Sequence, residues 1–277
     1  MPLFKVQAEA LAAISANRSP SSHIAGGIAI NHVGQRFSKD IDIFHDFGRS
    51  ANRAKLLEEV VAADAESLIN AGFRIVWDTT RQELFRAVIT KDSASTTLEW
   101  VIDSDFRFFP AIADDIFGYR LHTFDLATNK VLAAASRREP RDLVDLLTID
   151  KSFVSLPAVI WAAPAKDPGY TPESLVEDIR RNGRYVQGDY ERVWSEEQLD
   201  AGEISRTLKD LLRRAEDFAA TMPPGFEGAA FLENGTPVQP DVLNLQKYEI
   251  IHAERQAHWP SSPEIESEMI ASSYPRR

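Results

Sequence analysis

Residues 24–44 read I-A-G-G-I-A-I-N-H-V-G-Q-R-F-S-K-D-I-D-I-F, and this stretch decides the fold. A short apolar run leads to the pair Gly26–Gly27, a brief amphipathic segment follows, and a strand-like alternation carries Asp40 and Asp42. Successive residues of a strand point to opposite faces, so the two carboxylates leave one face together, about 6–7 Å apart along the chain. The isoleucines between and after them then face a core.

This spacing of residue types indicates a chemistry. Two carboxylates on one strand face repel each other unless a cation or water lies between them. A hard divalent cation with oxygen ligands, Mg²⁺ above all, suits such a pair. The glycine pair upstream lets backbone N–H groups come close to a phosphate. Together these features predict metal-assisted phosphoryl or nucleotidyl transfer.

The composition excludes several classes of function. The chain has 277 residues, of which 44% are hydrophobic and 26% charged, as in ordinary soluble globular proteins. No run of 18 apolar residues predicts a membrane span. The absence of cysteine excludes disulfides, thiolate metal sites and cysteine catalysis, and favours a cytoplasmic location. A net charge of −11 argues against general nucleic-acid binding but is compatible with a local basic patch.

Familiar catalytic motifs are missing. The six histidines form no H-E-x-x-H or similar cluster that would bind zinc. The sequence contains neither a Walker nor a Rossmann glycine motif, and no G-x-S-x-G elbow.

The hydrophobic pattern predicts the order of helices and strands. An N-terminal amphipathic helix comes first. Strands are expected at 23–25, 40–44, 73–77, 84–90 and 96–103, with an aromatic-rich loop at 106–119. Further helices are expected at 28–33, 51–71, 125–138, from 141 onward, and at 173–181, 204–221 and 242–258.

The strand at 96–103 carries a candidate third acid. Glu99 lies between two apolar residues, on the face opposite to them. One interpretation is an edge strand with a solvated face. The other is a metal-binding carboxylate facing Asp40 and Asp42, because three acids on adjacent strands supply the ligands of a two-metal site. Asp103 competes with Glu99 for this role.

Two later helices carry charged residues at regular spacing. In the first, Lys130 and Arg137 lie seven residues apart and therefore on one face. Pro140 ends that pattern, and the next helix opens with R-D-L-V-D. Its charged residues are Arg141, Asp142 and Asp145.

The motif G-G-x-A, then about seven residues, then R-x-S-x-D-I-D-I-F resembles the AbiEii/AbiGii group of nucleotidyltransferase toxins, within the polymerase-β-like nucleotidyltransferase fold. The lysine helix and the R-D-x-x-D-L run resemble the third and fourth motifs of that family, in the same order and at similar spacing. The resemblance covers roughly residues 20–150.

The resemblance implies a fold and a division of the chain. We expect an α/β (α+β) protein with the mixed sheet of the nucleotidyltransferase fold and flanking helices at residues 1–150. A mostly helical C-terminal domain follows at residues 151–277, where proline-rich punctuation separates helical segments.

The resemblance also implies roles for individual residues. The expected Mg²⁺ ligands are Asp40, Asp42 and Glu99, and Glu99 also orients or deprotonates the acceptor hydroxyl. These three acids and Lys130 form the expected catalytic set. Asp142 or Asp145 would hold Lys130 or Arg36 in place. The expected nucleotide-binding residues are Gly26, Gly27, Arg36, Ser38, Lys130, Arg141, Asp142 and Asp145.

The implied reaction moves a nucleoside monophosphate from an NTP to an acceptor hydroxyl on an RNA or tRNA end or on a protein. In the family the enzyme acts as a toxin beside a separate antitoxin protein. One position departs from the family pattern: Ile28 follows the glycine pair, where members commonly carry a serine or threonine. A hydroxyl contact to phosphate is lost there, which predicts a weaker grip on the triphosphate or a different nucleotide.

Other readings of the sequence stay open. An antibiotic (aminoglycoside-type) nucleotidyltransferase would need an acidic pocket for a cationic drug. A catalytically silent relative would bind a nucleotide or a partner protein. An unrelated α/β domain would carry D-x-D on a surface strand. A set of basic residues indicates either solvated helix faces or a track for an RNA acceptor: Arg180, Arg181, Arg184, Arg206, Lys209, Arg213 and Arg214.

Overall fold

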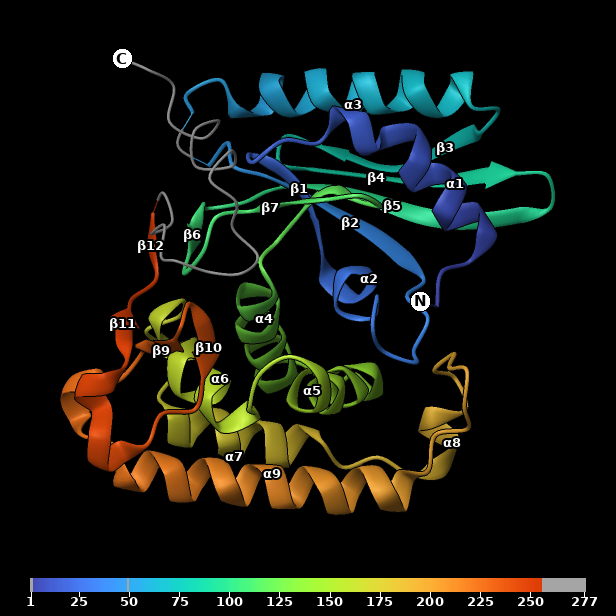
Figure 1. Cartoon of the computed structure of the whole chain (residues 1–277). Helices are drawn as coiled ribbons and strands as arrows, with labels where there is room; N and C mark the ends of the chain where they lie inside the picture. Colours follow the sequence, from blue (N-terminus) through green and yellow to red (C-terminus); the bar gives the residue numbers. More distant parts are fainter. Residues whose placement is uncertain (1, 49, 256–277) are drawn as a thin grey trace.

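The computed structural model describes residues 2–48 and 50–255, and it stacks a sheet on a helical half (Figure 1). The main sheet has seven strands in the order β3-β4-β5-β2-β1-β8-β7. Their bounds are β1 Ser22–Ala25, β2 Asp40–His45, β3 Arg74–Arg81, β4 Leu84–Lys91, β5 Ala94–Ile102, β7 Ile112–Asp114 and β8 Gly118–Arg120. β2 pairs with β5 and β1 with β8 in parallel, and the other neighbours are antiparallel. The predicted mixed α/β fold is therefore confirmed.

Alternating burial follows the predicted pattern in the two central strands. Ile41 and Ile43 of β2 are fully buried, while Asp42 between them is only partly buried. Leu98 and Trp100 of β5 are likewise fully buried on either side of Glu99. The apolar side chains of both strands thus share one face of the sheet, and the carboxylates share the other.

Two helices cover the apolar face of the sheet (Figure 1). They are α1, Lys5–Ile14, and α3, Arg53–Asn70. Gly72 follows α3 with a φ of +87°, which is the conformation glycine adopts when it ends a helix. On the opposite side, the short α2, Gly26–Ile30, begins at the glycine pair itself, two residues before the predicted start.

The helical half begins with α4 and α5, which connect it to the sheet (Figure 1). Its helices are α4 Thr123–Ser136, α5 Pro140–Ser152, α6 Leu156–Ala162, α7 Pro172–Asn182, α8 Gln187–Tyr190 and α9 Ala201–Thr221. α4 packs on α5, α6 and α7, and α9 packs on α5, α6 and α7. Buried apolar residues form one continuous cluster from the sheet to α9. The division of the chain at residue 150 stays a prediction.

The helix predicted at 242–258 is wrong for the residues that the structure describes there. Val242–Lys247 is a kinked 3-10 segment, and Glu249–Ile251 forms strand β11. β11 pairs with β9, Ala230–Glu233, which also pairs with β10, Thr236–Val238. The predicted helical face is not used, because Leu243 is 89% exposed while the β-branched Ile251 is buried in the small sheet. The last part of the prediction, 256–258, lies outside the described residues.

The aromatic-rich segment predicted as a loop at 106–119 contains three short strands. β6, Phe106–Arg107, pairs with β12, Glu254–Arg255, and β7 pairs with β8 at the edge of the main sheet. The segment returns the chain to the sheet before α4 begins.

Candidate active site

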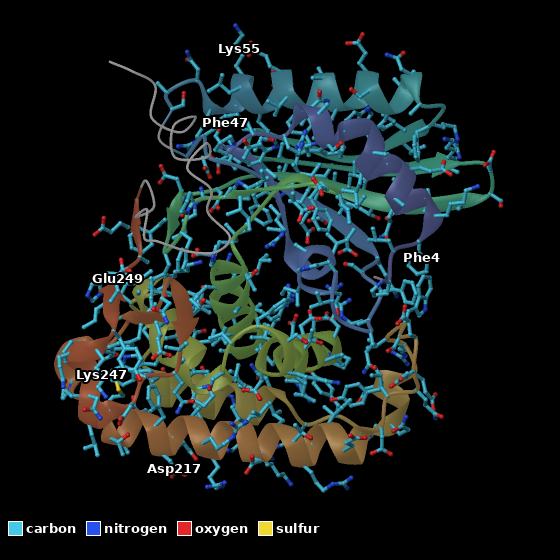
Figure 2. All side chains as sticks on the ribbon, in the orientation of Figure 1. Phe4, Phe47, Lys55, Asp217, Lys247 and Glu249 are labelled. Carbon is cyan, nitrogen blue, oxygen red and sulfur yellow. The ribbon has the colours of Figure 1, made fainter. Side chains whose placement is uncertain are left out.

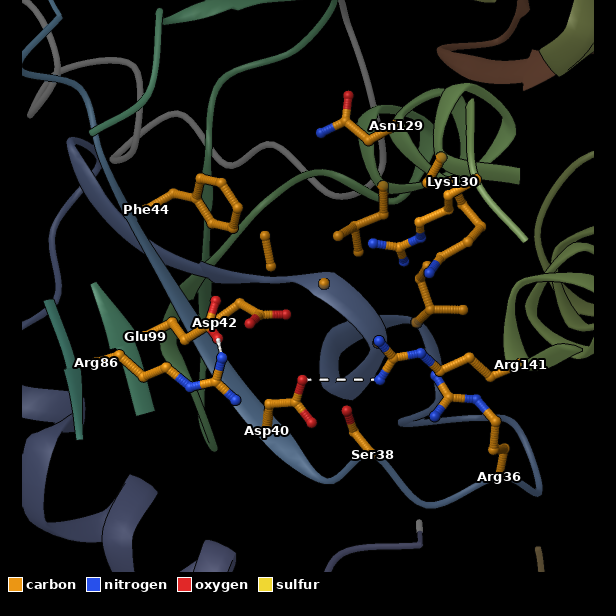
Figure 3. A pocket seen from close by; sticks show the side chains of 17 residues that line it. Arg36, Ser38, Asp40, Asp42, Phe44, Arg86, Glu99, Asn129, Lys130 and Arg141 are labelled. Carbon is orange, nitrogen blue, oxygen red and sulfur yellow. Dashed lines mark ion pairs between the residues drawn. The ribbon is translucent and has the colours of Figure 1, made fainter. Parts of the chain in front are cut away.

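A pocket opens where the polar face of β2 and β5 meets α2, α4 and the start of α5 (Figure 3). It brings together nine residues that the sequence analysis selected. These are Gly26, Gly27, Arg36, Ser38, Asp40, Asp42, Glu99, Lys130 and Arg141. Asp142 and Asp145 do not line the pocket but lie behind it, in contact with its basic side chains.

The three acids lie on one face of two parallel strands. Asp42 and Glu99 are direct partners in the register of β2 and β5, and Asp40 precedes Asp42 by two residues. Burial, and then the neighbouring charges of Asp40 and Glu99, raise the pKa of Asp42 to about 7. Like charges this close together repel each other, and a cation bound between them would relieve the repulsion.

Two arginines contact the outer acids. Arg141 Nη1 lies 3.7 Å from Asp40 Oδ2, and Arg86 Nη1 lies 3.3 Å from Glu99 Oε1 (Figure 3). In the described part of the chain, Asp40, Asp42 and Glu99 are not a group in which one carboxylate oxygen from each residue lies within 4.8 Å of the other two. The acids thus converge on one pocket without closing around a common point, and the outer two are drawn toward the arginines.

Arg86 is a residue that the sequence analysis missed. It lies on β4 and pairs directly with Glu99 of β5. Both strands were predicted, and the short link between them is typical of a hairpin. Pairing them in antiparallel register would have placed Arg86 beside Glu99.

The glycine pair leaves room for two charged side chains. Gly26 has a φ of +69°, and a Cβ atom there would lie 1.8 Å from Asp42 Oδ2. A Cβ atom on Gly27 would lie 2.5 Å from Arg36 Nη2. At Gly26 the Cβ atom would also lie within 3.1 Å of the Cγ and Cβ atoms of Asp42, so this glycine is needed for Asp42 to keep its place in the pocket. At Gly27 only the end of the Arg36 side chain would have to shift.

The basic side of the pocket is anchored by two buried acids from α5. Lys130 Nζ on α4 lies 2.8 Å from Asp142 Oδ1 and 3.0 Å from Asp145 Oδ2. Arg137 Nε donates to Asp142 Oδ2 at 2.8 Å. Burial alone would raise the pKa of Asp142, but the contacts with Arg137 and Lys130 lower it below its usual value.

Arg36 is fixed by Asp145 through two parallel hydrogen bonds of 2.8 and 2.9 Å. Its third nitrogen donates to the backbone oxygen of Phe37, and Asn31 also donates to Asp145. Burial would raise the pKa of Asp145, yet the charges of Lys130 and Arg36 bring it down to about 2. The guanidinium of Arg36 is therefore held in place beside Gly27 and contributes a fixed positive charge to the pocket. The nucleotide-binding roles of these residues stay predictions.

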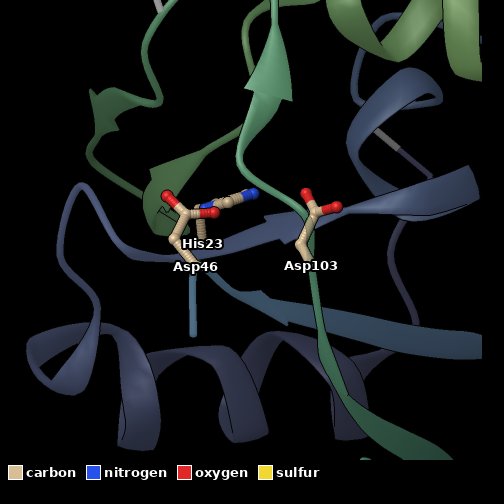
Figure 4. A group of neighbouring side chains, drawn as sticks. All are labelled: His23, Asp46 and Asp103. Carbon is tan, nitrogen blue, oxygen red and sulfur yellow. The ribbon is translucent and has the colours of Figure 1, made fainter. Parts of the chain in front are cut away.

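A second group of potential metal ligands lies outside the pocket: His23, Asp46 and Asp103 (Figure 4). One ligand atom from each lies within 4.8 Å of the others. Arg107 enters this group, with Nη1 at 3.3 Å from His23 Nε2 and a short contact to Asp46. Burial, and then the charge of Arg107, lowers the pKa of His23 well below its usual value. An arginine thus supplies the positive charge there. Asp103, the competitor of Glu99, belongs to this group and not to the pocket.

Four of the five arginines of α7 and α9 are paired with nearby acids, among them Asp217 on the outer side of α9 (Figure 2). Arg180 contacts Glu216, Arg181 contacts Asp178, and Arg213 contacts both Asp210 and Asp217. Arg214 contacts Asp150 and Asp210. These pairs fit the interpretation of solvated helix faces better than that of an RNA track.

Comparison with known proteins identifies the family. The family described as "Nucleotidyl transferase AbiEii toxin, Type IV TA system" matches residues 11–228. This chain belongs to the AbiEii family. The resemblance inferred from the motifs is confirmed, and the AbiEii chain is a nucleotidyltransferase of the toxin type. A search of curated proteins gave no match.

One solved structure is similar to this AbiEii protein in fold. It is MenT4, a nucleotidyltransferase toxin from Mycobacterium tuberculosis H37Rv. The two share 17% sequence identity with a TM-score of 0.50, over 79% of this chain and 83% of MenT4. In the described part of the AbiEii chain, no helix has the length and apolar character needed to cross a membrane.

Proposed function

We propose that this protein transfers a nucleoside monophosphate from an NTP to an acceptor hydroxyl, with Mg²⁺ held by Asp40, Asp42 and Glu99. The observation that carries the proposal is the composition of one pocket. Three carboxylates lie on one sheet face, and four basic side chains lie across from them beside the glycine pair: Arg36, Lys130, Arg137 and Arg141. An NTP needs this combination of cation-binding acids and phosphate-binding bases.

The acids fit a magnesium ion chemically. All their donor atoms are hard carboxylate oxygens, and Asp40 and Glu99 place like charges beside the buried Asp42. The contacts from Arg141 and Arg86, at 3.7 and 3.3 Å, are longer than the roughly 2.7–2.9 Å of a tight charged hydrogen bond. They can therefore give way. When bound, Mg²⁺ supplies charge neutralisation for the phosphates.

The proposed reaction is a substitution at the α-phosphorus. The acceptor hydroxyl oxygen forms a bond to that phosphorus, while the bond to the oxygen bridging the α- and β-phosphates breaks. The electron pair leaves with pyrophosphate, and Glu99 accepts the hydroxyl proton. Lys130 and Arg141 face the negative charge that develops on the leaving group, and Asp142 and Asp145 hold the basic side chains in place.

Ser38 offers the hydroxyl that position 28 lacks. Ile28 is buried in the core, with 2% of its surface exposed. Ser38 lines the pocket, and its Oγ lies 3.1 Å from the point where a Cβ atom of Gly27 would be. A serine beside the glycine pair therefore stands where a phosphate contact is needed. This supports an active enzyme over a catalytically silent relative.

The family also implies a biological role. As a type IV toxin, the protein would arrest growth by modifying an acceptor, with a cognate antitoxin opposing it. The acceptor is an RNA end or a protein hydroxyl. The cytoplasmic location stays a prediction.

Incubation with each labelled NTP, Mg²⁺ and total RNA or total protein tests the proposal. We expect label to enter a macromolecule, to require Mg²⁺ and to be lost in Asp42→Ala. The matched control is Asp103→Ala, a partly buried acid outside the pocket, which should keep transfer. Equal transfer by wild type and Asp42→Ala would refute the proposal. Thermal stabilisation by NTP without turnover would support the silent relative. In a parallel incubation with an aminoglycoside, label on the drug would support the antibiotic-modifying alternative.

A further inference from the structure

Arg86 occupies a special position among the basic residues of the pocket. Its side chain is 45% exposed and reaches from β4 to the carboxylate of Glu99. Figure 3 shows Arg86 and Glu99 to one side of Asp42, and Arg36 and Arg141 to the other. The acids thus lie between one arginine and a group of basic side chains.

The two sides of the acids differ in how their bases are held. On the side of the glycine pair, Arg36 and Lys130 are fixed by buried carboxylates, while Arg141 has a longer contact, at 3.7 Å to Asp40. On the side of Glu99, Arg86 has only loose contacts, at 3.3 Å to Glu99 and 3.6 Å to Asp78. Basic side chains that are held in place suit the triphosphate, which binds beside the glycine pair in the proposed reaction. A loosely held arginine can turn toward a second substrate.

In-line geometry places that second substrate near Arg86. The attacking oxygen enters opposite the leaving pyrophosphate. If the pyrophosphate lies against the glycine pair and the anchored bases, the acceptor hydroxyl enters from the side of Glu99. Arg86 is then the basic pocket residue on the entry side.

The two kinds of acceptor differ in what they present to an arginine. The 3′-terminal nucleoside of an RNA carries a phosphodiester on its 5′ side, one sugar away from the terminal hydroxyl. A serine, threonine or tyrosine hydroxyl has no anion at a fixed distance. The planar fork of an arginine matches a phosphate with two donors, so a lone arginine here recognises a nucleic-acid acceptor.

The sheet surface beyond Arg86 can accommodate such a chain. Residues two apart on a strand share a face, so Val88 lies on the face of Arg86. Val88 pairs with Val76, and these two valines are 37% and 48% exposed. Figure 1 shows α1 and α3 on the opposite face of these strands. The exposed surface is thus continuous with the entry side of the pocket.

We propose that Arg86 binds the last phosphodiester of an RNA acceptor and positions its 3′-terminal hydroxyl at Glu99. The proposal rests on the transferase function above, and what it adds is the role of Arg86 toward an RNA acceptor. The terminal oxygen bonds to the α-phosphorus, pyrophosphate leaves with the bond electrons, and the proton passes to Glu99.

The test pairs a protein change with a substrate change. A short RNA copying the labelled 3′ end is made with either a normal last linkage or a neutral methylphosphonate. With the normal RNA, Arg86→Gln should raise the acceptor KM by about ten- to a hundred-fold, as expected for one charge-assisted contact. With the methylphosphonate, Arg86→Gln and wild type should have similar KM values. Arg86→Lys should recover part of the loss.

Two readouts separate this role from charge balance at the acids. Removing a positive charge beside Glu99 should leave Mg²⁺ and NTP affinity unchanged or tighter. Arg53→Gln is the matched control, because Arg53 is 47% exposed and pairs with Glu83 on the other side of the sheet. It should leave the acceptor KM unchanged.

Specific outcomes would overturn the inference. They are label entering protein instead of RNA, the same Arg86→Gln loss with both RNAs, or weaker NTP binding without a change in acceptor KM. The absence of any transfer that depends on Asp42 would refute the proposed function itself, and this inference with it.

Discussion

The backbone of Gly26 lies so close to Asp42 that a Cβ atom would clash with the carboxylate at 1.8 Å. From the sequence, the glycine pair was expected only to let backbone N–H groups approach a phosphate. The structure adds a reason that no motif contains, since the small residue also lets an acid of the neighbouring strand point into the pocket. Similarly, Arg36 was predicted to bind nucleotide, but its donors are largely engaged by Asp145 and Phe37.

Gly26→Ala should therefore impair the site more than the fold. A left-handed conformation costs a non-glycine residue roughly 1–2 kcal/mol, and the displaced Asp42 carboxylate should reduce kcat at least about tenfold. Transfer assays and chemical denaturation measure the two effects. Gly225→Ala is the control, because a Cβ atom there has nothing within 4 Å. Normal turnover in Gly26→Ala would show that catalysis does not depend on the present position of the Asp42 carboxylate.

The raised pKa of Asp42 predicts a pH effect on stability in the presence of a chelator. Between the usual pKa of 3.8 and about 7, the folded protein binds more protons than the unfolded chain, so stability falls as pH rises through this window. The loss is at most about 4 kcal/mol, from roughly three pKa units at about 1.4 kcal/mol each.

Asp42→Asn removes this titration, so its advantage in unfolding free energy over wild type should grow from about pH 5 to about pH 8. Mg²⁺ should restore the wild type at the higher pH. Urea titrations at each pH provide the measurement. Parallel stability curves for the two proteins would contradict the assignment of the raised pKa to Asp42.

At the scale of elements, the alternation within each strand predicted the face on which each acid lies, and the pairing of the strands decided which acids come together. The apolar residues of β2 and β5 identified which face each acid takes, since successive side chains of a strand point to opposite faces of the sheet. Whether Glu99 or Asp103 joins Asp42 depended on the register between strands, which a single sequence does not contain. The register pairs Glu99 with Asp42, and Asp103 follows the end of β5 and joins His23.

One element prediction failed, and the bounds of another shifted. The segment from 242 has apolar residues at helical spacing, but β9 offers a strand edge that Ile250 and Ile251 pair with. Tertiary pairing overrides a weak local pattern. The short α2 begins at Gly26 because the close approach of Asp42 requires glycine there, and not because of helix propensity.

At the scale of the whole molecule, the pocket depends on both halves of the chain. Lys166 Nζ lies 2.6 Å from Asp125 Oδ1, and both side chains are buried. Asp125 in turn accepts hydrogen bonds from the backbone of Phe108 and Phe109, each at 2.9 Å. A residue after the predicted boundary thus holds the start of α4, the helix that carries Lys130.

We therefore predict that the chain unfolds as one unit, in spite of its predicted division at residue 150. A fragment ending at Ser152 would expose the face of α4 that packs on α7. Val131 of α4 and both Leu175 and Val176 of α7 belong to the same buried cluster. Apolar surface that stays exposed in this way makes the folded fragment less stable relative to the unfolded fragment. The fragment should show no cooperative transition in calorimetry, whereas the whole chain should show one. Two separate transitions in the whole chain, the first reproduced by the fragment, would contradict this prediction and support independent folding of the two halves.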